Sequence, residues 1–280
     1  MIQDIGPHRL HNEYRPDAKP GPGDLVFFFD GRNLCVRLKE GSFFLPRAEE
    51  VEGIQDPIYL FSLDDRACFL SPGPFPAALS QKGYVSMDIR RLRQEGYGPK
   101  ERYFAALTAL QLSTWYRDNR FCGTCGKETV LSQTERALVC PSCGRTIYPR
   151  IVPAVIVGVT DGDRILMTKY AGRGIPFYAL IAGFTEIGET LEETVEREVM
   201  EEVGLKVRNI RYYKSQPWAI ADDILAGFYC DVDGDTTIRL DTSELKEGVW
   251  MRREEVVLQP DDYSLTNEMM MMFKEGKEPR

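Results

Sequence analysis

Three glutamates in the second half of the chain have the spacing of a carboxylate cluster. Glu198, Glu201 and Glu202 stand at i, i+3 and i+4, so a helix would place them on one face. Like charges at this spacing cost an isolated helix about 0.2–0.5 kcal/mol per pair. Mg²⁺ or Mn²⁺ neutralises such a cluster and accepts phosphate oxygens from a substrate. The cluster therefore favours substitution at phosphorus, in which a metal polarises phosphoryl oxygens and activates a bound water.

The residues around the cluster predict a short helix with defined ends. Thr190 and Glu193 have the spacing of a capping box, and Gly204 stands where a helix ends in the left-handed conformation. Between them runs one apolar stripe, formed by Leu191, Val195, Val199 and Val203. The stripe indicates that one face of the helix is buried and that the acids line another.

Two residues outside the cluster are expected to shape it. Gly183 ends a strand-like run and allows a sharp backbone turn. Arg197 is expected either to pair with Glu193 or to brace Glu189 in the preceding loop, which leaves the three clustered glutamates without an obvious cationic partner. The acids by themselves favour a solvent-facing helix held by ion pairs, because most glutamate-rich helices are of that kind.

Four of the seven cysteines form a second constellation. They are arranged as C-x2-C, fourteen residues, C-x2-C, and a glycine follows each pair: Cys122, Cys125, Cys140 and Cys143. Four thiolates fill the tetrahedral coordination of Zn²⁺ and leave no position for a catalytic water. We expect one structural Zn²⁺ per chain in a small ribbon, and we expect Cys35, Cys68 and Cys230 to be buried thiols.

Basic residues outnumber acids in the cysteine segment by six to three, which suggests two alternatives. The excess could bind RNA phosphates, or it could be an ordinary solvated surface, and the second reading is favoured. The basic residues are Arg117, Arg120, Lys127, Arg136, Arg145 and Arg150, and the acids are Asp118, Glu128 and Glu135.

The composition excludes several classes of function. The net charge of −8 over 280 residues argues against broad adhesion to DNA or to an anionic membrane. His8 and His11 are the only histidines, and both fall in a segment expected to be a mobile arm. The rest of the chain therefore lacks the histidine that Ser-His-Asp and Cys-His catalysis require. No apolar run reaches membrane-spanning length, and the first twenty residues are polar, which predicts a cytoplasmic protein.

The pattern along the chain predicts three domains. Residues 1–117 form a β-rich domain that ends in a helix over residues 100–119, residues 118–150 form the ribbon, and residues 151–280 carry the carboxylates. The first domain has no chemical constellation and is expected to be structural or to support an interface. In the third, we expect a hairpin at Asp161-Gly162 and a last helix over residues 264–274 whose methionines pack in the core.

The full spacing around the acids resembles the Nudix box, G-x5-E-x7-R-E-U-x-E-E-x-G-U with U apolar. Gly183, Glu189 and the run R-E-V-M-E-E-V-G-L at residues 197–205 agree with every fixed position. The resemblance implies an α+β protein, with the box on an α/β/α sandwich built on a mixed sheet. It also implies hydrolysis of a nucleoside diphosphate linked to another group. By position, Glu198, Glu201 and Glu202 are the implied ligands of catalytic Mg²⁺ or Mn²⁺, and Glu189 and Arg197 are implied to orient the loop.

Residues 215–218 read S-Q-P-W, and with the preceding ribbon they resemble the NADH pyrophosphatase branch of the Nudix hydrolases. This resemblance implies cleavage of NADH or NAD⁺ to AMP and nicotinamide mononucleotide, removal of NAD caps from RNA, and a homodimer. Glu244 corresponds to a further metal carboxylate. Five residues correspond to substrate contacts, with the first reaching in from the partner subunit: Tyr148, Phe184, Gln216, Trp218 and Thr266.

The chain departs from this branch directly after the S-Q-P-W run. The branch continues P-F-P-x-S, whereas residues 219–223 read A-I-A-D-D, so the final serine is replaced by Asp223. A downstream S-I-A pattern reads S-L-T at residues 264–266. A Nudix hydrolase for ADP-ribose or dinucleoside polyphosphates therefore stays open as an alternative, and a non-catalytic zinc-ribbon RNA-binding module is a further alternative from another class.

Overall fold

The computed structural model describes residues 1–172 and 176–279, and the chain divides into two compact units. The N-terminal unit comprises residues 4–150, and the C-terminal unit comprises residues 1–3 and 151–280. No described helix combines the length and the apolar character needed to cross a membrane. The finer division into domains at residues 1–117, 118–150 and 151–280 remains a prediction.

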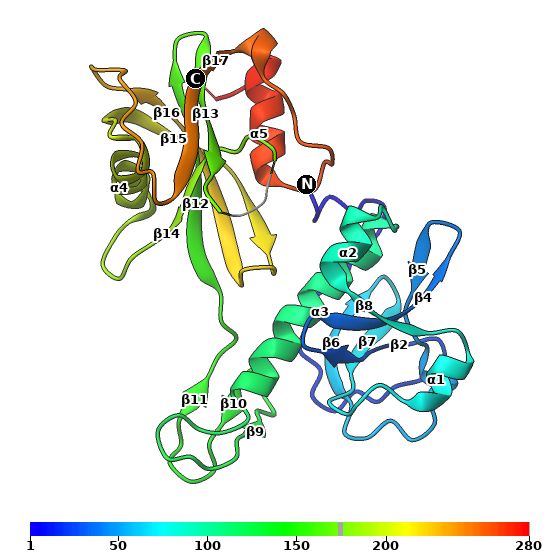
Figure 1. The fold of residues 1–280 in the computed structure, drawn as a ribbon. Helices are drawn as coiled ribbons and strands as arrows, with labels where there is room; N and C mark the ends of the chain where they lie inside the picture. The colour runs from blue at the N-terminus through cyan, green and yellow to red at the C-terminus, as the bar shows by residue number, and fades with distance from the viewer. Residues whose placement is uncertain (173–175, 280) are drawn as a thin grey trace. The chain divides into compact units, whose positions relative to one another are not determined.

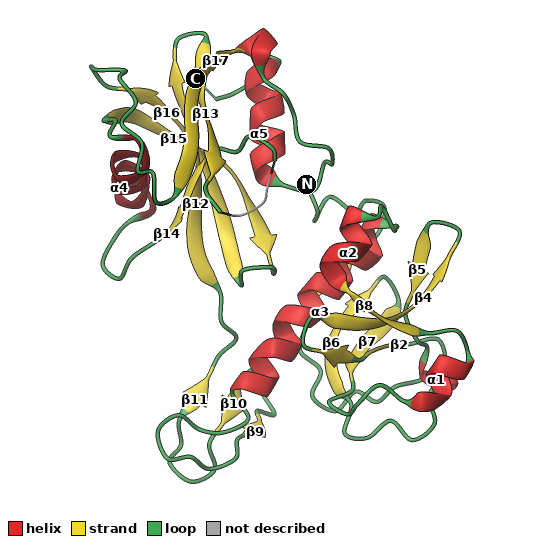
Figure 2. Cartoon of the chain, in the orientation of Figure 1, coloured by secondary structure: helices red, strands yellow, loops and turns green. Residues whose placement is uncertain are grey.

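The N-terminal unit consists of three small sheets and a long helix (Figures 1 and 2). One sheet has the order β1-β6-β7-β2, a second has β3-β4-β5 with β8 beside β4, and the ribbon sheet has β11-β10-β9. The strands are β1 (Leu10–His11), β2 (Leu25–Phe27), β3 (Phe29–Asp30), β4 (Asn33–Lys39), β5 (Ser42–Phe44), β6 (Ile58–Leu63), β7 (Arg66–Leu70), β8 (Val85–Asp88), β9 (Val130–Leu131), β10 (Leu138–Val139) and β11 (Thr146–Ile147). The helices are η1 (Ala48–Glu50), α1 (Ala77–Gln81), α2 (Ile89–Gln94) and α3 (Lys100–Asp118).

The predicted helix over residues 100–119 is confirmed by α3, but the predicted mobile arm is wrong. His11 lies in β1, where it pairs with Ser62 of β6. The Nδ1 atom of His8 lies 2.8 Å from Oδ2 of Asp64, and this contact raises the pKa of the histidine. Backbone pairing to a distant strand orders this segment, and its local composition does not reveal such a partner.

The ribbon is anchored to the rest of its unit by two side chains. The hydroxyl of Tyr14 donates a hydrogen bond to the carbonyl oxygen of Ser132 at 2.8 Å. The Arg136 guanidinium donates to the carbonyl oxygens of Asn12 and Leu60, and it lies 5.4 Å from the ring centroid of Tyr14. Arg136 therefore links the ribbon to β6 and to the segment that contains Asn12 and Tyr14.

The C-terminal unit is a three-layer sandwich around one mixed sheet, as the resemblance implied. The strand order is β15-β16-β12-β13-β17, with β14 beside β12, and only β12 and β16 run parallel among the described pairs. The elements are β12 (Val152–Asp161), β13 (Arg164–Tyr170), β14 (Ile181–Phe184), α4 (Leu191–Val203), β15 (Val207–Trp218), β16 (Asp223–Val232), β17 (Leu245–Arg252), η2 (Arg253–Glu255) and α5 (Leu265–Lys274). The predicted hairpin is confirmed, since Asp161 pairs with Arg164 across the turn.

The two helices of this unit cover opposite faces of the sheet (Figure 1). Helix α4 buries the predicted valine stripe against β12 and β16. Helix α5 buries Met269, Met270 and Phe273 against Ile156 and Tyr229 on the other face. The prediction is thus confirmed for two of the four methionines, while Met271 and Met272 are only partly buried. Successive residues of each strand therefore face either α4 or α5, and this alternation decides where each site residue points.

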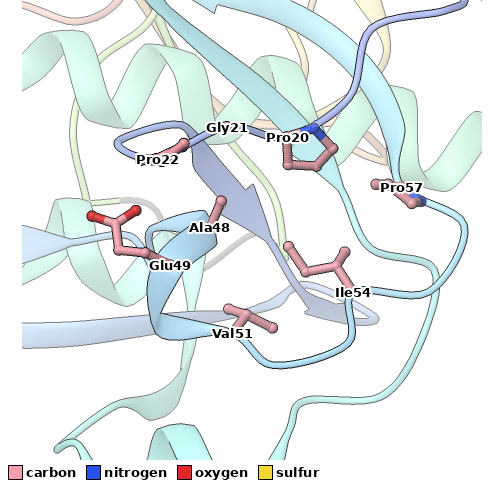
Figure 3. Close-up of a pocket in the computed structure, with 8 residues that line it drawn as sticks. All are labelled: Pro20, Gly21, Pro22, Ala48, Glu49, Val51, Ile54 and Pro57. Atoms are coloured by element: carbon pink, nitrogen blue, oxygen red, sulfur yellow. The ribbon is translucent and has the colours of Figure 1, made fainter.

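A hollow of about 340 Å³ lies in the N-terminal unit (Figure 3). Three prolines and a few apolar side chains line it, and Glu49 is its one charged residue. The Oε2 atom of Glu49 already accepts a hydrogen bond from the backbone N–H of Gly23 at 2.8 Å. This lining has neither a nucleophile nor a set of metal ligands.

Candidate active site

The four ribbon cysteines converge on one point. Their sulfur atoms all lie within 4.8 Å of one another, and two cross-pairs are closer, Cys122 with Cys143 at 3.6 Å and Cys125 with Cys140 at 3.4 Å. Tetrahedral Zn²⁺ with bonds of about 2.3 Å separates its sulfur ligands by about 3.8 Å. The thiols thus fit Zn²⁺, and four sulfurs saturate its coordination.

The glycine after each cysteine pair turns the backbone around the sulfurs. Gly126 and Gly144 have φ angles of +69° and +74°, which favour glycine. Their N–H groups donate to the carbonyl oxygens of Cys122 and Cys140 at 2.8 and 3.0 Å. The backbone N–H groups of the first loop, led by that of Thr124, lower the pKa of Cys122 to about 6, which favours the thiolate that binds metal.

Much of the positive charge around the ribbon is already engaged. Nε of Arg117 lies 2.9 Å from Oδ1 of Asp118, and Nε of Arg120 lies 3.0 Å from Oε1 of Glu128. Arg136 is held by carbonyl oxygens of its own unit. These contacts favour the solvated surface over an RNA-binding patch.

Helix α4 has both of the predicted ends. Thr190 Oγ1 accepts a hydrogen bond from the N–H of Glu193 at 3.2 Å, and Glu193 Oε2 accepts one from the N–H of Thr190 at 2.7 Å. At the other end Gly204 has φ +67° and ψ +25°, and its N–H donates to the carbonyl oxygen of Met200. The capping box and the left-handed glycine fix where the acidic helix begins and ends.

Gly183 is needed for close packing, and the prediction that it makes a sharp turn is wrong. It lies inside β14 and pairs with Val155, which faces α4. A Cβ atom on Gly183 would stand 1.9 Å from Cδ of Glu198. The absence of a side chain on the strand therefore provides the space for the Glu198 carboxyl group.

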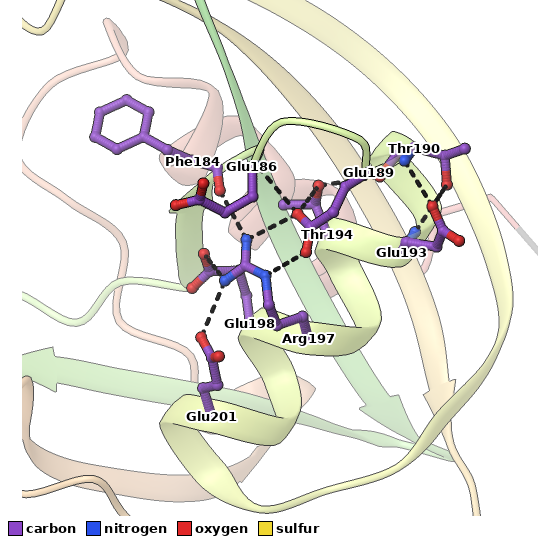
Figure 4. A network of polar contacts seen from close by, with 9 residues as sticks. All are labelled: Phe184, Glu186, Glu189, Thr190, Glu193, Thr194, Arg197, Glu198 and Glu201. Atoms are coloured by element: carbon purple, nitrogen blue, oxygen red, sulfur yellow. Dashed lines mark hydrogen bonds and ion pairs between the residues drawn. The ribbon is translucent and has the colours of Figure 1, made fainter.

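Arg197 is the centre of the polar network on α4 (Figure 4). Its Nε and Nη2 atoms donate to the two carboxylate oxygens of Glu189 at 2.6 and 3.0 Å, and Nη2 also donates to the carbonyl oxygen of Phe184 at 2.8 Å. Its Nη1 atom donates to Glu198 at 2.8 Å and to Glu201 at 2.9 Å. Of the two alternatives, Arg197 thus braces Glu189, while Glu193 is used in the cap.

The expectation that the clustered glutamates have no cationic partner is wrong for Glu198 and Glu201. Glu198 and Glu201 stand at i+1 and i+4 from Arg197, and the Arg197 guanidinium reaches both carboxylates. Glu201 is still 59% exposed, whereas Glu202 is only 2% exposed. The three acids therefore experience different environments although they share one helical face.

The pKa values of Glu189 and Glu198 are shifted in opposite directions. The bidentate hydrogen bonds from Arg197 lower the pKa of Glu189 to about 2. Burial raises the pKa of Glu198 against the effect of Arg197, and the negative charges of Glu201 and Glu244 raise it further. The influence of Glu244 on Glu198 indicates that the acid before β17 belongs to the same electrostatic neighbourhood.

The carboxylates are spread more widely than the thiols. Within residues 1–172 and 176–279, the ribbon cysteines are the one group of three or more metal-binding side chains with all ligand atoms inside 4.8 Å. In these residues the acids instead converge on the Arg197 guanidinium (Figure 4). Carboxylates on α4 and at Glu244 around the partly buried Glu198 suit Mg²⁺ or Mn²⁺, which take carboxylate oxygens and retain waters.

Two aromatic residues implied for substrate binding lie at the ends of strands. Phe184 ends β14 and is 50% exposed, and Trp218 ends β15 and packs in part against the core beneath α5. Thr266 lies in the first turn of α5. Tyr148 belongs to the N-terminal unit, is 58% exposed, and donates its hydroxyl hydrogen to Oε1 of Glu135 at 3.1 Å.

Gln216 is placed inside the protein, which disagrees with its expected contact to substrate. Its Nε2 donates to Oε1 of Gln3 at 3.0 Å and to the carbonyl oxygen of Tyr263 at 2.9 Å. Its Oε1 accepts the N–H of Leu265 at 2.7 Å. Both amide hydrogens are used, and the side chain is fully buried, so Gln216 ties the start of α5 to β15.

Comparisons with known proteins place these features in one family. The model of the NUDIX domain matches residues 149–272, and the model of the NADH pyrophosphatase zinc ribbon domain matches residues 117–148. Together the matches span more than half of the chain. Residues 149–272 form a NUDIX domain. Its acidic helix α4, with the loop before it, is therefore a Nudix box.

Several relatives share the name "NAD-capped RNA hydrolase NudC". The protein from Escherichia fergusonii is 37% identical over 182 residues, which are 65% of this chain and 66% of that protein. The protein from Enterobacter sp. is 43% identical over 152 residues, 54% of this chain and 58% of that protein. The matched region therefore spans somewhat less than two thirds of these relatives' own length. A solved Nudix hydrolase from Nitrosomonas europaea is 20% identical, with 56% of this chain and 91% of that chain covered and a TM-score of 0.48.

One residue of this Nudix domain gained importance only from the structure. Asp223 begins β16 as a buried carboxylate, and burial raises its pKa to about 6. The sequence contained a signal, because the acid replaces the serine that ends the P-F-P-x-S pattern. The sequence did not reveal that this acid is buried.

Cys122→Ser should remove the metal from the ribbon. Elemental analysis of the purified parent is expected to give one zinc per chain, and the variant should retain less than a fifth of it, because a structural Zn²⁺ site needs all four thiolates. The thermal midpoint should fall as well. Cys35→Ser is the matched control, since Cys35 is a buried thiol outside the ribbon, and it should keep its zinc. Equal zinc in all three proteins would contradict the assignment.

Gly183→Ala should weaken Mn²⁺ binding by at least about ten-fold, because the new methyl group displaces the Glu198 carboxyl group. Isothermal titration of Mn²⁺ measures the change. Val157→Ala, which removes buried atoms from the neighbouring strand, is the control for general destabilisation and should bind Mn²⁺ like the parent. Unchanged Mn²⁺ affinity in Gly183→Ala would show that the packing of Glu198 is unimportant for the metal.

Proposed function

We propose that the chain hydrolyses the pyrophosphate bond of NADH and NAD⁺ to AMP and nicotinamide mononucleotide in the presence of Mg²⁺ or Mn²⁺. The observation that carries the proposal is the Glu198 carboxyl group, seated against Gly183 and oriented by Arg197, within a Nudix box that follows an NADH pyrophosphatase ribbon. The S-Q-P-W run and the NudC relatives support the choice of substrate.

Four glutamates would hold the divalent cations: Glu198, Glu201, Glu202 and Glu244. The partly buried position of Glu198 fits this role, because a carboxylate whose pKa is raised by burial gains stability from a further positive charge. A bound cation would polarise the phosphoryl oxygens, stabilise the leaving phosphate and lower the pKa of a water.

Arg197 and Glu189 act as positioning residues in this proposal. The guanidinium links the loop, through Glu189 and the Phe184 carbonyl oxygen, to the acids of α4. Because the hydrogen bonds from Arg197 lower the pKa of Glu189 to about 2, this link stays ionised at neutral pH. The box is therefore held in shape before a metal or a substrate arrives.

Phe184, Trp218 and Thr266 would contact the substrate at the end of the sheet. Aromatic faces suit the two flat rings of NAD, and Phe184 presents half of its surface to solvent. We also propose a homodimer in which Tyr148 reaches into the site of the partner subunit. Its exposure supports this arrangement, which the resemblance implied.

NAD-capped RNA is the second proposed substrate, because its cap contains the same pyrophosphate bond. The printed names of the relatives support it. The engaged arginines of the ribbon argue that the chain recognises the cap more than the body of the RNA. The thiol ligands of the ribbon suit the cytoplasm, where we place the enzyme.

A second candidate function is hydrolysis of ADP-ribose or a dinucleoside polyphosphate. The observation that favours it is the run A-I-A-D-D at residues 219–223, in which Asp223 stands in the place of the serine that ends the P-F-P-x-S pattern. A changed base subsite would alter the preferred dinucleotide, whereas the metal site on α4 would be unaffected.

The experiment is a panel of kcat/KM values for NADH, NAD⁺, ADP-ribose and diadenosine polyphosphates with Mg²⁺ or Mn²⁺, with AMP followed by chromatography. NADH or NAD⁺ should be the best substrate. Glu198→Gln should lose about 10²–10³-fold in kcat, because it removes a charge from the metal site. Glu196→Gln, on an exposed position of the same helix, should behave like the parent. Preferred cleavage of ADP-ribose would establish the second candidate, and no cleavage of any compound would contradict both.

A further inference from the structure

Asp223 is a buried carboxylate whose interactions within the protein are incomplete. It is 7% exposed, and its Oδ1 atom accepts no hydrogen bond from any described residue. None of the ion pairs among residues 1–172 and 176–279 includes it. A buried acceptor without a donor costs about 1–3 kcal/mol, and a charged one costs more. Such a group needs a reason beyond the stability of the fold.

The register of the sheet places Asp223 beside an aromatic residue of the proposed substrate site. Asp223 is the cross-strand partner of Trp218 on β15 and of Val152 on β12. Two residues farther along β12, Ala154 pairs with Phe184 of β14. Asp223, Trp218 and Phe184 are thus near one another at the same end of the sheet.

The alternation of side chains puts these residues on one face. Ala154, Leu225 and Trp218 all pack in the core cluster that contains the α5 methionines. Asp223 is two residues from Leu225 along β16, and Phe184 is the cross-strand partner of Ala154, so both face the same side. From strand spacing and rise, the Cα atoms of Phe184 and Asp223 are about 12 Å apart. A nucleotide can span that separation.

The local charge at this end of the sheet is negative. Burial is the main reason for the raised pKa of Asp223, and the charge of its neighbour Asp222 adds to it. Since that pKa is about 6, the carboxylate is still mostly ionised at pH 7.5. A buried anion beside an aromatic face is complementary to a flat ring that carries positive charge or N–H donors.

We propose that Asp223 is a specificity-determining residue of the proposed hydrolase. Its carboxylate accepts a hydrogen bond from the base of the ligand, and its negative charge favours the cationic ring of oxidised nicotinamide over the neutral reduced ring. The serine of the resembling branch would offer a hydroxyl group at this position, whereas the acid adds charge. This inference rests on the proposed function. The proposed metal site lies on the α4 face of the sheet, whereas Asp223 lies on the α5 face. Neighbouring residues of β14 show the two faces, because Gly183 faces α4 and Phe184 faces α5.

The test compares kcat/KM for NAD⁺ and for NADH at pH 7.5 in the parent, Asp223→Asn and Asp223→Ser. The parent should prefer NAD⁺ by roughly ten- to a hundred-fold, and both variants should bring the ratio close to one, because they remove the charge. Asp222→Asn is the matched control. It removes the neighbouring charge at a position with φ +59°, which asparagine tolerates, and it should keep the preference of the parent.

A binding measurement separates this inference from the proposed function. Titration calorimetry with NAD⁺ and NADH in a Glu198→Gln background gives the affinity ratio without turnover, and Asp223→Asn added to that background should abolish the preference. If the parent hydrolyses neither form but the binding preference depends on Asp223, the proposed function fails and the inference stands. If turnover occurs and Asp223→Asn leaves both ratios unchanged, or if Asp222→Asn shifts them equally, the inference is overturned. The thermal midpoint of Asp223→Asn should be no lower than that of the parent, which checks folding.

Discussion

The candidate active site depends on one packed contact, that of the Glu198 carboxyl group against Gly183. Burying a carboxylate is unfavourable unless hydrogen bonds and positive charge compensate it. Arg197 supplies part of that compensation, and the same guanidinium holds Glu189, Glu201 and the Phe184 carbonyl oxygen. Arginine suits this role because its planar fork has five donors, which a lysine ammonium does not offer.

The surrounding fold keeps this contact in place. The capping box and Gly204 fix the length of α4, and its valine stripe packs on the sheet next to β14. Since β14 pairs with β12, Gly183 faces the acids and Phe184 faces the other side of the sheet. A single strand therefore connects a metal-binding face with a face suited to a flat ring, and the proposed substrate would reach around the end of the sheet.

The sequence predicted the features that depend on nearby residues. The ends of α4, the helix α3, the hairpin after β12 and the four-cysteine ribbon all follow from local spacing, and the structure contains each of them. The resemblance to the Nudix box also implied the sandwich built on a mixed sheet. Local rules suffice here because caps, turns and metal knuckles involve residues only a few positions apart.

Features that depend on contacts between distant segments were missed. The N-terminal segment was expected to be mobile, yet it pairs with β6, and Gln216 was expected at the substrate, yet it ties α5 to β15. The role of Gly183 depends on a side chain fifteen residues later, and the burial of Asp223 depends on the pairing of three strands. No local pattern reveals such partners, since the fold brings them together.

The most direct measurement of the central claim is an anomalous difference map from crystals grown with Mn²⁺. The account predicts a manganese peak with Glu198 among its ligands, within about 2.3 Å of the carboxylate oxygens on α4, and with Gly183 still packed against that side chain. A map in which Mn²⁺ binds elsewhere, while the Glu198 carboxyl group stays bound to Arg197 alone, would contradict the account.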